Sequence, residues 1–270
     1  AQTLVAAFTG RGNAAQAYTM ALIQVAVYDA TVAVRGSDSK NRPSYKPFIA
    51  DIVAPAGADL NAAIATAAFN VGYARVNSNE TARANYRNAY AAYIAAIPDG
   101  QAKTHGIAVG EATAKAVLAA RSSDNFYNTA SYTNPTADAG VWQSVPAATP
   151  YATAGANDYA MAFTVPLTAE SPEARRIKPP PRLASGKYRR DFEETKSYGS
   201  LASPVRTPAM TNVVQFWTES GFTLWSRNVR DIVTARGLNE FEAARALAAF
   251  SVATGDAMLA CFESKYAHMF

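Results

Sequence analysis

Side chains that commonly carry out catalysis or bind metals are scarce in this sequence. It contains two histidines, His105 and His268, and a single cysteine, Cys261. A serine–histidine–aspartate triad would need one of these histidines, and nothing near either of them supports such a triad. One cysteine excludes an intrachain disulfide and a metal site built from several cysteines. The signatures HExxH, CxxC and GxSxG, the Walker loop and the EF-hand loop are also absent. We therefore expect no catalytic residue and no metal site within this chain.

Charged residues near the C-terminal end stand out because the segment around them is apolar. Asp256 lies inside this segment. A buried carboxylate without a partner is costly, so we expect a structural partner such as an arginine or a helix N-terminus. Glu263 follows seven residues later, near the same face of a helix. Lys265, taken alone, is typical of a solvated lysine at a helix end, where the helix dipole favours it. Cys261 is expected to behave as a small buried hydrophobic residue.

The overall composition indicates a globular chain of 270 residues, of which 49% are hydrophobic and 17% charged. The formal net charge of +4 is small for this length, which argues against nucleic acid as a partner. The densest basic stretch, residues 175–190, is followed directly by acidic residues and is typical of a solvated surface. The most apolar segment, residues 18–34, is interrupted by Gln24 and Asp29, so no membrane span is expected.

Four helices are predicted within residues 1–121, because apolar residues recur there at helical spacing between capping and breaking residues. Asp59 is the expected N-cap of the second helix, and Pro98 stops the third. Gly106 and Gly110, four residues apart in the fourth helix, predict close packing on a neighbouring helix. The four helices are expected at residues 14–34, 60–76, 79–97 and 104–121.

Residues 122–206 differ from the rest of the chain in composition. Proline, threonine, asparagine, serine and glycine dominate this segment. A structureless loop of this length would be unusual in a compact domain. We therefore expect an ordered excursion that wraps the helical bundle and contains one short helix at residues 187–196. Aromatic residues are expected to pin the excursion to the surface, and these are Trp142, Tyr151, Tyr159 and Phe163.

Residues 207–270 return to a helical pattern. Asn239 and Glu242 have the spacing of a capping box at the start of the last helix, which is expected to span residues 240–263. Small residues on several faces of this helix predict close packing on its neighbours, and thus a central position. The sequence therefore predicts an all-α fold, a helical bundle with a long Pro-rich irregular excursion.

A family resemblance is carried by the end of the chain. Asp256-Ala257, Lys265-Tyr266 and Phe270 occur there in that order. In bacterial vanadium-dependent haloperoxidases an Asp-Ala pair is followed by Lys-Tyr and then by an aromatic-rich stretch that leads into Trp-Arg-Pro. The chain resembles this family, part of the larger phosphatidic-acid-phosphatase-like superfamily, and the Trp-Arg-Pro would fall immediately past the last residue. Further similar segments occur upstream in the expected order, at residues 26–30, 97–100, 179–183, 206–207 and 216–217.

The resemblance implies the N-terminal half of a haloperoxidase-type helical fold, with most active-site residues outside this chain. Vanadate, like phosphate, is a compact oxyanion that needs several positive donors and N–H groups around it. In the family, a lysine and an arginine seven residues apart supply part of this set. A downstream Ser-Gly-His and a final arginine and histidine complete it. Among those residues only Lys265 is present here, so the resemblance implies that Lys265 is a ligand of a vanadate cofactor in the complete protein.

The implied function is peroxide-dependent oxidation of halide, with hydrogen peroxide and halide as substrates, and this chain alone is expected to be inactive. The remaining residues would belong to a C-terminal half or a partner chain. Two alternatives stay open: an acid phosphatase of the same superfamily, and a non-enzymatic helical scaffold that forms homo-oligomers. The sequence begins Ala1-Gln2 without an initiator methionine, as it would after removal of a signal peptide. This predicts an extracellular or periplasmic location.

Overall fold

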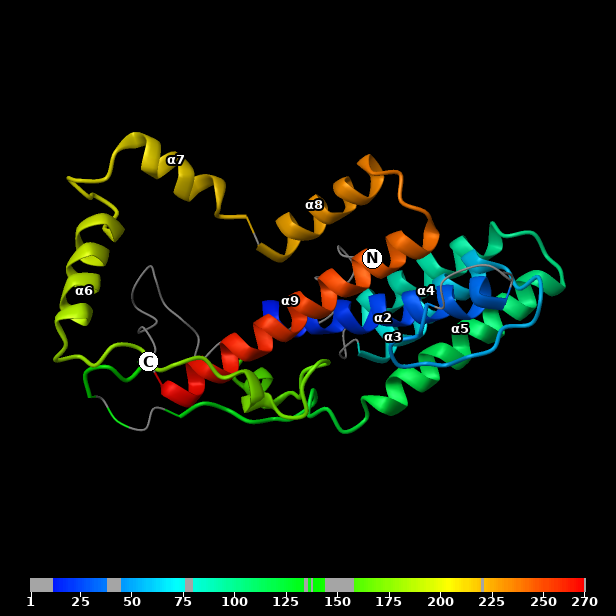
Figure 1. Cartoon of the computed structure of the whole chain (residues 1–270), viewed down its shortest axis with the longest axis horizontal. Coiled ribbons are helices and arrows are strands. Elements are labelled where there is room, and N and C mark those ends of the chain that lie inside the picture. Colours follow the sequence, from blue (N-terminus) through cyan, green and yellow to red (C-terminus); the bar gives the residue numbers. More distant parts are fainter. Residues whose placement is uncertain are drawn as a thin grey trace.

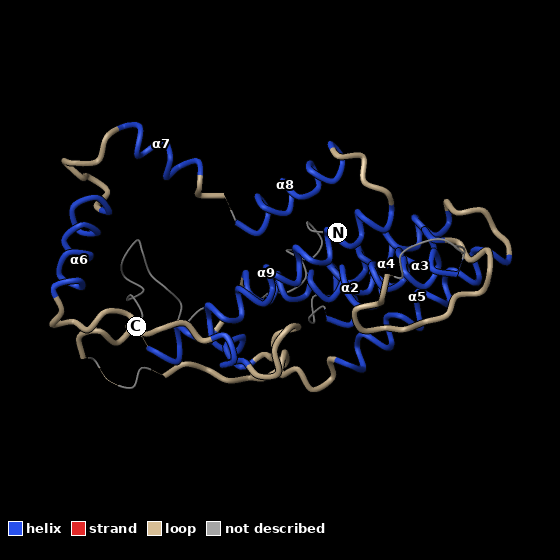
Figure 2. Tube along the Cα trace, in the orientation of Figure 1, coloured by secondary structure: helices blue, strands red, loops and turns tan. Residues whose placement is uncertain are grey.

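Helices make up all the regular structure in the computed structural model, which describes residues 12–37, 45–75, 80–133, 136, 138–143, 158–219 and 221–269 (Figures 1 and 2). No strand occurs among these residues, and the predicted all-α class is confirmed. Tyr151 and Phe270, each assigned a role from the sequence, lie outside the described residues, as do residues 76 and 79, which end and begin two predicted helices. The α-helices are α2 (Asn13–Ser37), α3 (Leu60–Arg75), α4 (Glu80–Ala95), α5 (Gln101–Ala120), α6 (Gly186–Gly199), α7 (Pro208–Phe216), α8 (Gly221–Ala235) and α9 (Glu240–His268). Two short 3-10 helices are η1 (Tyr159–Phe163) and η2 (Pro172–Arg175).

α2 lies at the centre of the bundle and packs against α3, α5 and α9. Its side chains supply much of the hydrophobic core, and Tyr18, Leu22 and Ile23 are at most 2% exposed. By length and composition, α2 and α9 are each apolar enough to cross a membrane. However, 78% of the apolar window of α2 is buried inside the protein, as expected for a core helix.

α9 packs one face on α2 and leaves an adjoining face exposed. Ala249, Ala253, Ala257 and Cys261 form an exposed line along this face, each four residues after the last. The prediction that the last helix is central is therefore wrong, and α2 has that position. The prediction that Cys261 is buried is wrong for the same reason. A small side chain can lie on either face of a helix, and packing against α2 decided which face is covered.

α3 and α5 approach each other closely at two glycines. A Cβ atom on Gly106 would lie 2.3 Å from the carbonyl oxygen of Asp59, and one on Gly110 would lie 2.5 Å from that of Ala63. Both distances are far shorter than a van der Waals contact, so the predicted close packing is confirmed. The side chain of Asp59 also accepts a hydrogen bond from the N–H of Ala62 at 2.7 Å, which confirms it as the N-cap of α3.

Asp29 in α2 is a buried carboxylate that holds the loop preceding α3. It accepts hydrogen bonds from the backbone N–H groups of Phe48, Ile49 and Ala50 at 2.6, 2.9 and 2.8 Å. Burial raises the pKa of Asp29, and the three hydrogen bonds offset part of this effect. The acidic residue that interrupts the apolar sequence of α2 is thus a structural anchor.

Asp124, just after α5, is the centre of a second buried polar network. It pairs with Arg75 at 2.9 Å, and both side chains are 3% exposed. It also accepts a hydrogen bond from the hydroxyl of Tyr18 at 2.8 Å. Arg121 lies 3.8 Å from the same carboxylate and donates to the Tyr18 hydroxyl at 3.0 Å. The network joins α2, α3 and the end of α5 inside the core.

α6, α7 and α8 belong to an arm, residues 183–236, that arches away from the bundle (Figure 1). α6 and α7 bury no residue, whereas α8 buries Leu224 and Ser226. The arm also exposes many large apolar side chains, which is typical of a surface that another polypeptide covers. In the arm they are Leu183, Phe192, Tyr198, Leu201, Val205, Met210, Val213, Val214, Phe216, Trp217, Trp225 and Ile232.

Candidate functional site

Lys265 lies in the last turn of α9. This helix begins at the predicted capping box, in which Asn239 and Glu242 each accept a hydrogen bond at 3.1 Å from the backbone N–H of the other. It contains 29 residues and is therefore about 43 Å long at 1.5 Å per residue. α9 thus carries Lys265 to the end of the bundle opposite the turn that joins α8 to α9.

Three aromatic rings surround the ammonium group of Lys265. Its Nζ atom lies 5.7, 5.7 and 5.1 Å from the ring centroids of Trp142, Phe262 and Tyr266. Each such cation–π contact is worth about 0.5–1 kcal/mol at an exposed site. The side chain is partly exposed, and no described residue forms an ion pair with it. Aromatic rings, rather than a carboxylate, therefore hold Lys265.

Trp142 and Tyr266 belong to an aromatic cluster that fastens a loop to the end of α9. The backbone N–H of Trp142 donates to the carbonyl of Met269 at 2.9 Å. The ring of Tyr266 lies 5.6 Å from that of Tyr132 and 4.8 Å from that of Tyr159, between centroids. Burial raises the pKa of Tyr266 to about 12, so its phenol stays neutral at physiological pH.

Asp256 has structural partners, as the sequence predicted, but they are of another kind than expected. Its carboxylate accepts hydrogen bonds from the N–H of Leu167 at 2.7 Å and from the N–H and hydroxyl of Thr168 at 2.8 and 2.6 Å. The donors are groups of an irregular loop, and not the arginine or helix N-terminus that we expected. All of its contacts are explained by holding this loop on α9.

Glu263 faces the same segment as Asp256, as their spacing predicted. It pairs with Arg176, and the hydrogen bond from that guanidinium raises the pKa of Arg176. The next residue, Ser264, accepts a hydrogen bond from the N–H of Ile177 at 2.9 Å. His268, to which the sequence assigned no role, has its Nε2 2.9 Å from the carbonyl oxygen of Ile177. These contacts are structural.

A cavity of about 260 Å³ opens beside this end of α9, and Lys265 is not among its lining residues. Arg176 reaches the cavity, but its charge is paired with Glu263. An oxyanion site needs several converging donors. Lys265 and the exposed Lys178, next to Ile177, form no ion pair with a described residue at this end. Such cations attract an anion without enclosing it. His105 is remote, because it lies in the first turn of α5 at the opposite end of the bundle (Figure 1).

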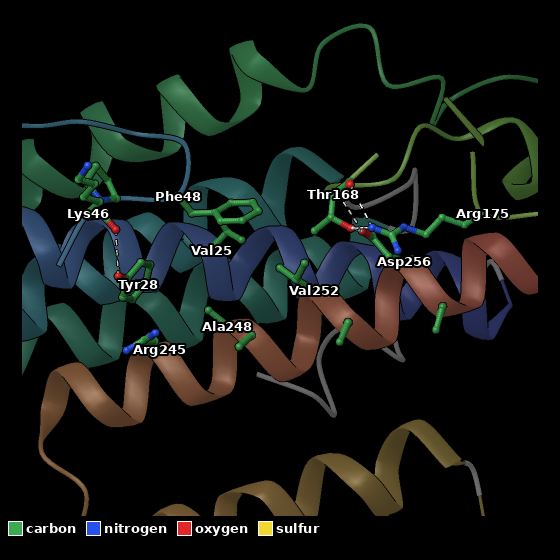
Figure 3. Close-up of a pocket in the computed structure, with 14 residues that line it drawn as sticks. Val25, Tyr28, Lys46, Phe48, Thr168, Arg175, Arg245, Ala248, Val252 and Asp256 are labelled. Carbon is green, nitrogen blue, oxygen red and sulfur yellow. Dashed lines mark hydrogen bonds between the residues drawn. The ribbon is translucent and has the colours of Figure 1, made fainter. Parts of the chain in front are cut away.

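A larger groove of about 620 Å³ follows α9 on its side toward α2, and the sequence analysis missed it (Figure 3). Its lining includes Tyr28, Arg245 and Val252, from two helices more than 200 residues apart in sequence. The only local signal is the four-residue spacing of small residues, such as Ala249 and Ala253, which leaves room beside a helix. That spacing predicted close helix packing, and here it leaves a groove instead.

Comparison with known proteins adds a structural likeness. No protein-family model matches this chain, and no curated protein matches its sequence. Its structure is similar to the crystal structure of a bacterial vanadium-dependent iodoperoxidase, with a TM-score of 0.74 and 16% sequence identity. The match covers 97% of this chain and 66% of that chain. At this identity the likeness shows the fold, and the haloperoxidase-type helical fold expected from the sequence is confirmed.

Proposed function

We propose that this chain is the helical N-terminal portion of a vanadium-dependent haloperoxidase-like enzyme, which oxidises halide with hydrogen peroxide. In this proposal Lys265 binds the oxyanion, and most of the active site belongs to polypeptide outside the chain. The observation that carries the proposal is the agreement between two independent features. One is the likeness of almost the whole chain to an iodoperoxidase fold, and the other is the motif around Lys265.

The chemistry of Lys265 fits the role of an oxyanion ligand. Its ammonium group is partly exposed and is not neutralised by any acidic residue in the described part of the chain. The rings of Trp142, Phe262 and Tyr266 restrict its movement without consuming its charge. When bound, vanadate would supply activation of peroxide and transfer of oxygen to halide. The contribution of this chain would be to hold one positive charge against the oxyanion and to keep water from one side of it.

The position of Lys265 depends on contacts made by its neighbours on α9. Asp256 and Glu263 hold the 167–177 segment against one face of the helix, and the aromatic cluster covers its end. Substitution of these carboxylates is therefore expected to change the orientation of the last turn. They act in this proposal as positioning residues.

The exposed apolar side chains of the arm support the proposal that further polypeptide belongs to the protein. α6 and α7 bury no residue, and Phe216 at the end of α7 and Trp217 directly after it are 66% and 54% exposed. The fold likeness leaves about a third of the iodoperoxidase chain without a counterpart here, because the match covers 66% of that chain. Polypeptide equivalent to that third would cover such a surface and supply the other oxyanion donors.

The test is to sequence the gene beyond the codon for Phe270, express the full reading frame, and assay it with vanadate, peroxide and iodide or bromide. We expect halide oxidation that requires vanadate, falls at least tenfold in Lys265→Met and is partly retained in Lys265→Arg, because arginine also donates to oxyanions. Lys115→Met on α5 is the control for loss of one exposed lysine and should keep full activity.

Other outcomes would contradict the proposal. Hydrolysis of a phosphomonoester without halide oxidation would assign the fold to an acid phosphatase. A reading frame that ends at Phe270, together with a stable homo-oligomer and no activity, would instead support a helical scaffold.

A further inference from the structure

The 620 Å³ groove along α9 has a shape and a charge distribution that the proposed function does not use. Seven residues of α9 between Arg245 and Ala257 line it on one side. These residues span about 18 Å along the helix at 1.5 Å per residue. The opposite wall comes from α2 and from residues 46–48 of the preceding loop (Figure 3). The groove is thus long, narrow and open to ligands from solvent.

The middle of the groove is apolar. Val25 and Val252 lie on its floor, and Phe48 lies over them with 46% of its surface exposed (Figure 3). Ala248 and Ala253 leave space between these larger side chains. An unbranched hydrocarbon chain would bury apolar surface here, and this burial would favour its binding.

One end of the groove is cationic. Lys46 and Arg245 line it there beside Tyr28, whose hydroxyl donates to the carbonyl of Lys46 at 3.0 Å. Neither cation forms an ion pair with a described residue, and Arg245 lies over the ring of Tyr45 at 6.0 Å. Two positively charged residues therefore line this end of an apolar groove.

The acidic residues near this end are engaged elsewhere. Asp29 accepts three backbone hydrogen bonds from the loop, and Glu240 pairs with Arg35 at 2.8 Å. Glu242 accepts the hydrogen bond of the capping box. At the other end, Arg175 and Asp256 both line the groove, so one charge of each sign is present there. The excess of positive charge is thus confined to the end that contains Arg245.

We propose that this groove binds a free long-chain fatty acid, with its carboxylate between Lys46 and Arg245 and its chain along Val25 and Val252 toward Ala257. The charge complementarity selects a single anionic head group, and the apolar floor selects an unbranched tail. The acyl tails of one bilayer leaflet span about 15 Å, half the thickness of the hydrocarbon core. The groove, about 18 Å long, can therefore hold a tail of this length. This inference does not rest on the proposed function, because Lys265 does not line the groove.

The test measures binding to the full chain of three soluble probes by titration calorimetry below their micelle-forming concentrations. Dodecanoate carries the acid and the tail, dodecyltrimethylammonium carries the same tail with the opposite charge, and acetate carries the acid alone. We expect saturable binding of dodecanoate at a ratio near one to one, and at least tenfold weaker binding of the other two probes. These differences follow from the loss of either the charge contact or the buried tail.

Variants assign the binding to the groove. Lys46→Gln combined with Arg245→Gln should weaken dodecanoate binding about tenfold or more. Ala253→Phe, at an exposed position that lines the groove, should block the tail. Arg189→Gln combined with Arg190→Gln on α6 removes two exposed charges far from the groove and should change nothing.

Several results would overturn the inference. They are equal affinity for the anionic and cationic probes, binding that appears only with micelles, and binding unchanged by Ala253→Phe. Absence of dodecanoate binding in a protein that sediments as a dimer would mean that a second copy covers this face. Each of these results leaves the halide-oxidation test of the full reading frame unaffected.

Discussion

Thr168 donates both its backbone N–H and its hydroxyl to the same carboxylate oxygen of Asp256, at 2.8 and 2.6 Å. The two residues are 88 positions apart in sequence. This carboxylate is the point at which the loop before η2 is fastened to α9.

Replacing Asp256 by alanine is expected to lower the free energy of unfolding by about 2–3 kcal/mol, because three donors lose their acceptor. Thr168→Val removes the hydroxyl alone and should cost about 1 kcal/mol. Urea unfolding monitored by circular dichroism measures both values. Equal losses in the two variants would show that the hydroxyl, and not the backbone donors, dominates this contact.

Gly106→Ala should destabilise the protein by at least about 2 kcal/mol, because the added Cβ would lie 2.3 Å from the backbone oxygen of Asp59. Gly36→Ala is the matched control, since no atom lies within 4 Å of a Cβ at that position in α2. The control should be neutral or stabilising by about 0.5–1 kcal/mol. Thermal unfolding of the two variants provides the comparison. Similar midpoints would contradict the close contact between α3 and α5.

Asp124→Asn is expected to destabilise the protein by about 3 kcal/mol. The substitution leaves the guanidinium of Arg75, which is 3% exposed, without its counter-charge inside the core. The double variant that also carries Arg75→Met should recover part of the loss, because it removes the stranded charge. A double-mutant cycle of unfolding free energies measures the coupling. Simple additivity would show that the two residues do not interact.

The carboxylate of Asp29 should make folding stability depend on pH in an unusual direction. Burial raises the pKa of Asp29 above its ordinary value of 3.8, so the unfolded chain releases this proton before the folded one does. The contribution of Asp29 is therefore fully present below about pH 4 and is lost as pH rises through the folded pKa. Stability of the wild type relative to Asp29→Asn should fall between pH 3 and pH 7. A rise over that range would mean that the three backbone donors outweigh burial.

Vanadate should bind this chain only weakly. A single exposed ion contact contributes about 0–1 kcal/mol, and Lys265 does not line the cavity at the end of α9. Titration monitored by ⁵¹V NMR should show no saturation at micromolar concentrations. Micromolar binding that Lys265→Met abolishes would mean that this chain contains a complete oxyanion site.

The sequence by itself determined the features that depend on near neighbours in the chain. Asp59 and Asn239 were recognisable as N-caps because a cap bonds to N–H groups two or three residues ahead. The spacing of Gly106 and Gly110 indicated a close helix contact because it recurs on one face of a helix. The motif around Lys265 indicated a fold that the structural likeness supports. Its role as a ligand stays a prediction.

Tertiary structure alone decided which faces are covered and which distant groups meet. The N-terminus of α2 is capped by Asp158, which accepts hydrogen bonds from the N–H groups of Gly12 and Ala14 at 3.0 Å across more than 140 positions. Tertiary structure also decided which loop binds Asp256 and that Cys261 is exposed. Helical periodicity defines a face, but small residues such as alanine fit against a neighbour or against solvent at nearly equal cost. Only the packing of α9 on α2 therefore determines which side is buried and where a groove remains.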